Sequence, residues 1–398
     1  MIIEIPREVE RFGAIHFGGL QKVFELDSGP KRKKFSEDKS VIRQISYEEL
    51  YEIQKKMAIV VPVRSERLKL IEGVLCGIPH QCLIIIVSNS PRKPVDRFQI
   101  EQDILKDFCT FVKKNALIIH QKNPIFASTF KNVGYTSILN KKGGIRNGKA
   151  EGMIIGILLA ALAERDYVGF IDADNYFPGS VVEYIREYAA GFIMNKSKYS
   201  MVRIAWHSKP KIVNSKLFFR KWGRVSENTN QLLNKLISNY TGYETGIIKT
   251  GNAGEHAMTM ELATYLDYTA GYSIEPFEII NLLEKFGGIK KSLHPEVLKH
   301  RVKVSQIESR NPHLHEAGDS EHISQMNYMA MRVIYHSSIC PDELKKEILS
   351  NMYKQKYLEK EKKPPQIRHF PNLISINLKS FLKDLKQTPY AHLIREGI

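Results

Sequence analysis

The stretch MAIVVPV, residues 57–63, decides the fold because it is the first of several almost uninterrupted apolar segments. Helix-like stretches separate these segments. A strand that is apolar along its whole length must be covered on both faces, which is typical of a parallel sheet with helices on either side. Right-handed crossovers between such strands build an open, doubly wound α/β sheet, whose ligands lie beyond the carboxyl ends of the strands. The later segments are LIIIVSN from Leu83, ALIIH from Ala116, YVGFID from Tyr167 and YSMVRIAW from Tyr199.

The composition indicates a folded, basic protein. The chain has 398 residues, of which 43% are hydrophobic, and 59 Lys and Arg against 43 Asp and Glu give a formal net charge of +16. These values exclude a disordered or collagen-like chain. The charge suits nucleic acid, an anionic membrane or an enzyme with phosphorylated substrates, and charge alone does not choose among them. The density of Lys, Arg and Glu also suits a heat-adapted, thermostable protein.

The sequence gives no sign of export or membrane insertion. The amino-terminal MIIEIPREVERFG carries three glutamates where a signal peptide needs an apolar run. The most apolar run, residues 153–163, is far shorter than the ~20 residues that span a bilayer. The four cysteines lack a CxxC spacing, which argues against a thiolate zinc site and a secreted disulfide framework. We therefore expect a cytoplasmic protein.

Two carboxylates follow the strand that begins at Tyr167. Asp172 and Asp174 stand in FIDADNYF, at the strand end where this fold places its ligands. A single Asp at such a point commonly caps the following helix. Two nearby carboxylates repel each other unless a cation lies between them, and Mg²⁺ or Mn²⁺ held by carboxylates usually also binds substrate phosphate oxygens. The pair therefore predicts a divalent-metal site.

Three other families use similar strings, and this chain departs from each of them. Aspartyl-phosphate phosphatases carry DxD after their first strand with Thr or Val next, whereas Asn175 and Tyr176 follow here. The stretch GGIRNGK, residues 143–149, has P-loop spacing, but Ala150 replaces the Ser or Thr that would bind Mg²⁺. Sugar-nucleotide pyrophosphorylases need their glycine-rich loop after the first strand, where this chain has PVRSERLKLI. What remains is a basic, glycine-rich loop that opens a helix and suits anionic ligands.

Several motifs taken together resemble GT-A type glycosyltransferases that use a nucleotide-sugar donor. They are PVRSER at 62–67, SNS at 88–90, NGKAEGM at 147–153 and IDAD at 171–174. Later motifs narrow the resemblance to the mannosyl-3-phosphoglycerate synthases, and more distantly to the bacterial glucosyl-3-phosphoglycerate synthases. These are KWGRVSENTN (221–230), GNAGEHAM (251–258), AGYSIEPFEI (270–279) and ESRNPHLHE (308–316), so the resemblance covers most of residues 57–330.

The resemblance implies an α/β fold of the GT-A type, with an open, mainly parallel twisted sheet, helices on both faces and a C-terminal helical extension. The expected parts are residues 1–56 as a mixed extension packed on the main domain, 57–220 as the donor-binding half, 221–330 as the acceptor-binding half and 331–398 as a C-terminal helical region.

The resemblance also implies transfer of mannose from GDP-mannose to 3-phosphoglycerate, with the anomeric configuration retained. A divalent metal ion is the implied cofactor, with Mg²⁺ first and Mn²⁺, Co²⁺ or Zn²⁺ as further candidates. The expected partners are the two substrates and a second copy of the chain in a homodimer. Nucleic acid and membrane insertion are not expected.

The resemblance assigns roles to individual residues of these motifs. Lys149 faces the donor diphosphate, and Asp174 and Glu275 complete the catalytic set, with Glu275 near the reacting sugar. The metal ligands are Asp172, Asp174 and either His313 or His315. The nucleotide-binding residues are Pro62, Val63, Arg64, Glu66, Ser88, Asn89, Lys149, Asp172 and Ala173, and the acceptor-binding residues are Gly223, Arg224, Ser226, Gly254 and Glu275.

Several alternatives stay open at this point. A glucosyl-3-phosphoglycerate synthase would use another sugar, and a sugar nucleotidyltransferase or a basic nucleic-acid-binding protein is a more distant alternative. Nucleic-acid binding predicts strong salt dependence and indifference to Asp172 and Asp174. Retention is achieved either through a covalent glycosyl carboxylate or by same-face attack. The acceptor proton goes either to Glu275 or to the departing phosphate.

Overall fold

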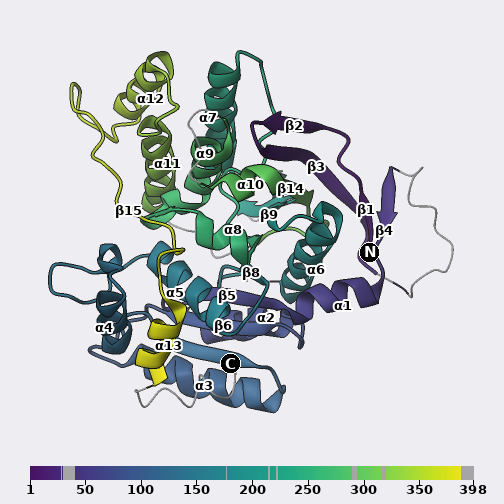
Figure 1. Ribbon diagram of the computed structural model, residues 1–398, viewed down its shortest axis with the longest axis vertical. Coiled ribbons are helices and arrows are strands. Elements are labelled where there is room, and N and C mark those ends of the chain that lie inside the picture. Colours follow the sequence, from purple (N-terminus) through teal and green to yellow (C-terminus); the bar gives the residue numbers. More distant parts are fainter. Residues whose placement is uncertain are drawn as a thin grey trace.

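One large sheet crosses the described part of the molecule, and helices cover both of its faces (Figure 1). The computed structural model describes residues 1–27, 29, 41–175, 177–213, 216–220, 223–288, 294–314 and 320–386. The strands of the sheet within these ranges are β1 (Ile2–Glu4), β2 (Val9–Phe12), β3 (Ile15–Glu25), β4 (Ile42–Gln44), β5 (Met57–Val63), β6 (Leu83–Ser88), β7 (Ala116–His120), β8 (Tyr167–Phe170), β9 (Tyr199–Ala205), β12 (His256–Thr259) and β14 (Val302–Glu308). They form an 11-stranded sheet in the order β4-β1-β3-β14-β9-β12-β8-β5-β6-β7, with β2 paired to β3.

Two sets of parallel strands lie on the two sides of β12 in this order. β5 pairs in parallel with β6 and β8, and β6 pairs in parallel with β7. In the second set, Val302 of β14 lies opposite Tyr199 of β9 on one side and Ile15 of β3 on the other. β12 joins the two sets because it pairs antiparallel with both β8 and β9. This layout confirms the predicted open, mainly parallel α/β sheet and adds β12, which the glycine-rich GNAGEHAM stretch does not predict.

The helices divide between the two faces of the sheet. One face carries α1 (Tyr47–Lys55), α2 (Leu68–Gly77), α3 (Arg97–Phe111) and α6 (Pro178–Asn195). The other carries α4 (Pro124–Asn132), α5 (Lys149–Leu162), α7 (Arg224–Thr241), α8 (Met260–Tyr265), α9 (Ile274–Phe286), α10 (Pro295–His300), α11 (Ser320–Tyr335), α12 (Asp342–Lys354) and α13 (Leu378–Lys386).

Alternate residues of the parallel strands enter two separate cores. Val60 and Ile85 pack into the core under α5, whereas Val61 and Ile86 pack into the core under α2 and α6. Because neighbouring residues point to opposite faces, these strands are apolar along their whole length. Gly156 lets α5 approach the sheet closely, since a Cβ atom on it would lie 2.4 Å from Val60 Cγ1.

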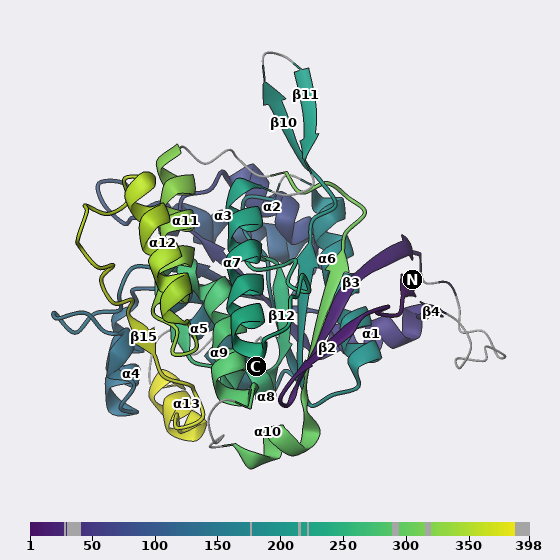
Figure 2. The same ribbon diagram turned by 90° about the horizontal axis from the view of Figure 1, so that it is seen from above.

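The C-terminal helices lie over the face that carries α5. α11 packs against α7 and α9, and Phe381 of α13 lies edge-on to Phe130 of α4 with ring centroids 5.1 Å apart. β13 (Tyr268–Thr269) forms a short antiparallel pair with β15 (His369–Phe370). This pair attaches the segment between α12 and α13 to the body of the molecule. A separate hairpin, β10 (Lys209–Val213) with β11 (Lys216–Arg220), projects from the body shortly before α7 (Figure 2). None of the described helices is both long and apolar enough to cross a membrane.

Candidate active site

Three charged side chains meet at the sheet edge where β5, β6 and β8 end. Asp172 lies on the turn after β8, and Lys149 is the first residue of α5, which runs back across the sheet from this edge. Glu275 lies in the first turn of α9. Lys149 Nζ lies 2.7 Å from Asp172 Oδ1 and 2.9 Å from Glu275 Oε1. The structure thus brings together three of the residues that the sequence assigned to catalysis and binding.

Lys149 is held as a cation. Its side chain is 19% exposed, against 35% for Asp172 and 8% for Glu275. Burial, the largest single influence, lowers the pKa of Lys149, but the charges and hydrogen bonds of the two carboxylates together raise it well above its ordinary value. An ammonium that stays charged in a partly buried site is suited to stabilise negative charge on a ligand.

The loop ahead of β12 lies against this cluster. A Cβ atom on Gly254 would lie 2.6 Å from Asp172 Oδ2 and 3.5 Å from Lys149 Nζ, so a side chain there would displace the carboxylate. Asn175 Nδ2 donates to the Asp172 carbonyl oxygen at 2.9 Å and to Glu255 Oε1 at 3.0 Å. These bonds hold the loop and the turn after β8 together.

The loops that follow β5 and β6 lie side by side at the same edge. Asn89 N donates to the Val63 carbonyl oxygen at 2.8 Å, and Ser65 N donates to Ser90 Oγ at 2.8 Å. Ser65 has a φ of 67°, which is uncommon for a residue other than glycine. Asn89 Oδ1 is buried and has no hydrogen-bond partner among the described residues. A ligand with an N–H or O–H group would satisfy that oxygen.

Two predicted nucleotide-binding residues are engaged within the protein. Glu66 Oε2 accepts from Arg64 N at 2.5 Å, and burial raises the pKa of Glu66. The Ser88 hydroxyl donates to the buried Glu101 Oε2 at 2.8 Å. This bond stabilises the start of the loop after β6 from the protein interior. Glu101, on α3, is a supporting residue that no sequence motif singles out. Of the other predicted residues, Pro62 and Val63 end β5 and Ala173 is buried between the two aspartates.

The predicted acceptor motif lies at the start of α7. Gly223 precedes the helix, Arg224 is its first residue and Ser226 lies in its first turn. Lys221, Trp222 and the side chain of Arg224 lie outside the described part of the chain.

Side-chain hydrogen bonds attach α7 to the loop ahead of β12. Thr229 Oγ1 accepts from Asn252 Nδ2 at 3.0 Å, and Asn230 Oδ1 accepts from Gly251 N at 2.7 Å. The same loop carries Gly254 beside the charged cluster. The acceptor motif is therefore connected to the cluster through a short, well-bonded stretch of backbone.

The two candidate histidines differ in what the structure describes. His313 is buried, its ring stacks on Trp206 with centroids 4.3 Å apart, and its Nδ1 lies 3.3 Å from Tyr184 Oη. Trp206 Nε1 in turn donates to Glu255 Oε2 at 2.9 Å, close to the turn after β8. His315 lies outside the described residues. Within the described ranges, no group of three or more His, Cys, Asp or Glu side chains is spaced to hold a metal ion.

Tyr272 is a further residue of the site. It lies on the 3₁₀ turn Gly271–Ser273 just before α9, and its pKa is raised by burial. Lys149, Arg64 and Asp172 are all near enough to influence its ionisation. It belongs to the AGYSIEPFEI motif, but its residue type alone does not mark it as part of a charged site.

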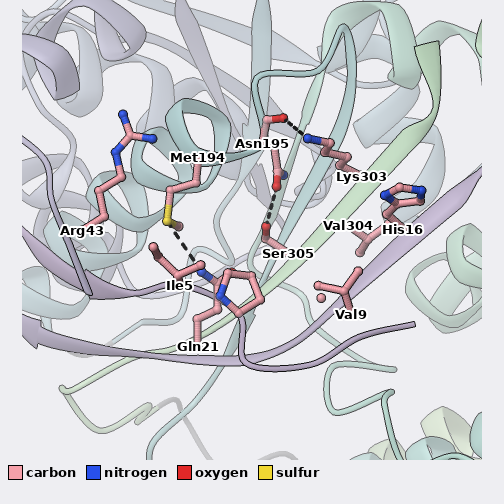
Figure 3. A pocket seen from close by; sticks show the side chains of 12 residues that line it. Ile5, Val9, His16, Gln21, Arg43, Met194, Asn195, Lys303, Val304 and Ser305 are labelled. Atoms are coloured by element: carbon pink, nitrogen blue, oxygen red, sulfur yellow. Dashed lines mark hydrogen bonds between the residues drawn. The ribbon is translucent and has the colours of Figure 1, made fainter. Parts of the chain in front are cut away.

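A separate cavity of about 250 Å³ lies between the N-terminal strands, β14 and the end of α6 (Figure 3). Asn195 accepts from Lys303 Nζ at 2.7 Å through its carbonyl oxygen and from Ser305 Oγ at 2.9 Å through Oδ1. Gln21 Nε2 donates to Met194 Sδ at 3.6 Å. None of the predicted site residues lines this cavity, so it is not part of the candidate active site.

A family model and two relatives in sequence agree on one family. A family model described as mannosyl-3-phosphoglycerate synthase matches residues 5–385. A mannosyl-3-phosphoglycerate synthase from Pyrococcus furiosus is 45% identical over 401 residues, covering 100% of both chains. Another, from Aeropyrum pernix, is 34% identical over 369 residues, covering 92% of this chain and 94% of the relative.

The solved structures that the chain resembles share less of its sequence. A mannosyl-3-phosphoglycerate synthase from Rubrobacter xylanophilus gives a TM-score of 0.45 at 16% identity, covering 81% of this chain and 90% of the other. A glucosyl-3-phosphoglycerate synthase from Mycobacterium tuberculosis was solved in complex with Mn²⁺, UDP-glucose and phosphoglyceric acid. It gives a TM-score of 0.46 at 18% identity, and the match covers 80% of this chain and 90% of the other.

Proposed function

Because this chain belongs to the mannosyl-3-phosphoglycerate synthase family, we propose that it transfers mannose from GDP-mannose to 3-phosphoglycerate, with retention, and releases GDP. The observation that carries the proposal is the Lys149 ammonium between Asp172 and Glu275, at the edge of the sheet where strands β5 and β6 end. Cleavage of the anomeric bond leaves negative charge on the departing diphosphate. Lys149 stabilises that charge more in the transition state than in the ground state, which lowers the barrier.

The two strand-end carboxylates suit a divalent metal ion. Asp172 and Asp174 are both partly exposed on the turn after β8. Mg²⁺ is commonly bound by one or two carboxylates together with substrate phosphates, so this donor set does not need a third protein ligand. When bound, the ion neutralises charge on the diphosphate. We propose Mg²⁺ as the ion, with His313 or His315 as a candidate additional ligand.

The loops after β5 and β6 are the proposed nucleotide pocket. Asn89 Oδ1 is a buried acceptor that lacks a partner among the described residues, and a guanine or ribose donor would supply one. Glu66 and Arg64 lie on the facing loop. Hydrogen bonds to a base edge discriminate strongly between bases. We expect Glu66→Ala to weaken GDP-mannose binding more than ADP-mannose binding, and unchanged affinity for both would remove Glu66 from the pocket.

The start of α7 is the proposed site for the acceptor phosphate. Backbone N–H groups at a helix start favour an anion, and an arginine fork binds two phosphate oxygens in one plane. Losing a charge-assisted contact should raise the KM for 3-phosphoglycerate in Arg224→Ala by about tenfold to a hundredfold. Arg224→Lys should restore only part of this, because an ammonium binds as a point charge. A wild-type KM in Arg224→Ala would refute the assignment.

The proton of the acceptor hydroxyl has two candidate destinations. If Glu275 takes it, Glu275→Gln should lower kcat by about a hundredfold or more, as expected for loss of a general base. If the departing phosphate takes it, the loss should be smaller and should match the loss of one hydrogen bond to Lys149. The kcat of this variant at saturating substrates separates the two routes.

One assay tests the whole proposal. Purified protein is incubated with GDP-mannose, 3-phosphoglycerate and Mg²⁺, and GDP release is followed with each component omitted in turn. We expect release only when both substrates are present, loss of release in Asp174→Ala or with a chelator, and poor use of glycerate. No GDP release from the complete mixture would refute the function, and release unaffected by Asp174→Ala would refute the metal site.

Two properties of the protein in the cell belong to the same proposal. All four cysteines, Cys76, Cys82, Cys109 and Cys340, are free thiols, which suits the reducing cytoplasm that we propose. A homodimer is the proposed assembly. Light scattering after size-exclusion chromatography tests it, and a monomeric mass at assay concentration would refute it.

A further inference from the structure

A fully buried ionic cluster lies directly behind the candidate active site. Arg203 of β9 places Nη1 2.7 Å from Glu278 Oε2 of α9, and His256 of β12 places Nε2 3.1 Å from Glu278 Oε1. All three side chains have no exposed area. Removing charges from water is costly, and a buried ion pair is weak evidence for stability because apolar residues often replace one without loss. The cluster therefore calls for a role other than holding the fold together.

The Arg203 guanidinium also donates to backbone carbonyls of two separate segments. Nε donates to Thr250 O at 3.0 Å, and Nη2 lies 2.9 Å from Thr250 O and 3.4 Å from Gly251 O. Nη2 also donates to Glu275 O at 3.0 Å. One planar group thus fixes the spacing between the loop ahead of β12 and the first turn of α9.

His256 holds the other end of the same loop. Its Nδ1 lies 3.0 Å from Ala253 O and 3.1 Å from Gly254 O, while Nε2 faces Glu278. The cluster therefore contacts the loop at two places, the carbonyl groups of residues 250–251 and those of residues 253–254. Gly254 is the point where this loop meets Asp172.

We propose that Arg203 is a positioning residue of the transfer reaction. Acting through the Glu275 carbonyl and the 250–254 loop, it sets the Glu275 carboxylate and the Asp172 side chain at the correct distance from Lys149. Glu278 orients the guanidinium, and His256 anchors Glu278. The inference rests on the proposed function, since it concerns residues assigned to that reaction. A displacement of about 1 Å in such a site is enough to cost roughly a hundredfold in rate.

Arg203→Lys is the first test. A lysine keeps the positive charge near Glu278 but cannot reach the carbonyls of Thr250, Gly251 and Glu275 together, because it presents a single ammonium. We expect kcat to fall by roughly tenfold to a hundredfold at a temperature where circular dichroism shows the variant fully folded, with the KM for GDP-mannose changed less than threefold. Lys285→Met is the matched control, because it removes the 2.8 Å contact to Asp267 at the far end of α9. Its kcat should stay within twofold of wild type.

A double-mutant cycle tests whether Arg203 acts through Glu275. In a Glu275→Gln background, Arg203→Lys should lower kcat much less than it does in wild type, because the group being positioned is already impaired. A merely structural role predicts the same fold-loss in both backgrounds. If Arg203→Lys does not fold, Glu278→Gln serves in its place, since it keeps the side-chain volume and loosens the guanidinium; a loss of about threefold to tenfold is then expected.

The outcomes separate this inference from the proposed function. If the wild-type protein releases no GDP, the proposed function fails and the inference fails with it. If the wild type is active but the folded Arg203→Lys, or Glu278→Gln in its place, keeps the wild-type kcat while losing thermal stability, only the inference is overturned. Equal losses in both Glu275 backgrounds overturn it as well.

Discussion

Lys149→Met is the sharpest test of the charged cluster. The ammonium lies 2.7 Å from Asp172 Oδ1 and 2.9 Å from Glu275 Oε1, and methionine keeps a similar length and volume without the charge. The change therefore removes the cation that we propose stabilises the departing diphosphate, and it leaves the two carboxylates without their shared partner. We expect a large loss of rate and a smaller loss of stability, and each can be estimated from the geometry.

The expected magnitudes follow from exposure and distance. At an effective dielectric constant of about 20, each of these contacts is worth about 6 kcal/mol of gross attraction. Desolvation offsets most of it, and Asp172, at 35% exposed, is screened by water, so we expect a net cost of about 1–3 kcal/mol in the free energy of unfolding. Removing one preorganised stabiliser of transition-state charge typically lowers kcat by about a hundredfold to a thousandfold.

Initial rates of GDP release at saturating substrates measure the first effect, and guanidinium unfolding measures the second. Lys142→Met is the control, because Lys142 is an exposed lysine that lies just before the glycine-rich loop 143–149. It should leave both quantities close to wild type. A Lys149→Met enzyme that folds and retains a kcat within threefold of wild type would show that the ammonium does not act on the leaving group.

Three further changes probe the close-packed Gly254, the partly buried Asp267 and the fully buried Glu187. Gly254→Ala places a Cβ atom 2.6 Å from Asp172 Oδ2. We therefore expect kcat/KM for GDP-mannose to fall by roughly tenfold to a hundredfold, with little change in melting temperature. Burial would raise the pKa of Asp267, but hydrogen bonding to His369 and the charge of Lys285 lower it well below its usual range. The stabilisation that ionised Asp267 gives the folded state is therefore complete above the unfolded pKa of about 3.9 and is lost as the pH falls further. The free energy of unfolding of Asp267→Asn should consequently fall less steeply below this pH than that of the wild type. Burial raises the pKa of Glu187 well above normal, so the folded state holds a proton that the unfolded state releases. Glu187→Gln should be more stable than wild type by a margin that grows from pH 5 to pH 8; equal stability at pH 8 would contradict this.

Strand content and the strand-end aspartates could be predicted because their signals are local. The segments at Met57 and Leu83 are apolar along their length, and each is indeed buried on both faces. β12 could not be predicted in the same way, because HAMT is four residues long and follows a glycine-rich loop. Its identity as a strand comes from the partners β8 and β9 on either side, which no local pattern contains.

The residues that support the site could not be predicted from the sequence for a related reason. Arg203 sits inside an apolar strand, and its partner Glu278 lies 75 positions away on a helix, so only the folded chain brings them together. Glu101 likewise looks like an ordinary helix carboxylate until Ser88 and Ser90 are seen to donate to it. Buried polar partners of this kind are set by tertiary contacts, which single-sequence patterns do not encode.

The pairing of β3 with β14 has a consequence for how the chain is made. Gln306 Nε2 donates to Gly18 O across a separation of 288 positions, so one edge of the 11-residue β3 has no partner until β14, which ends at residue 308 of 398, has left the ribosome. β5, β6 and β7 can pair as they emerge. Long-range pairing is slow, and an open strand edge is a template for joining other chains. The nascent protein therefore passes through a long interval of vulnerability to aggregation, which slower translation would lengthen and a chaperone bound to the early strands would cover.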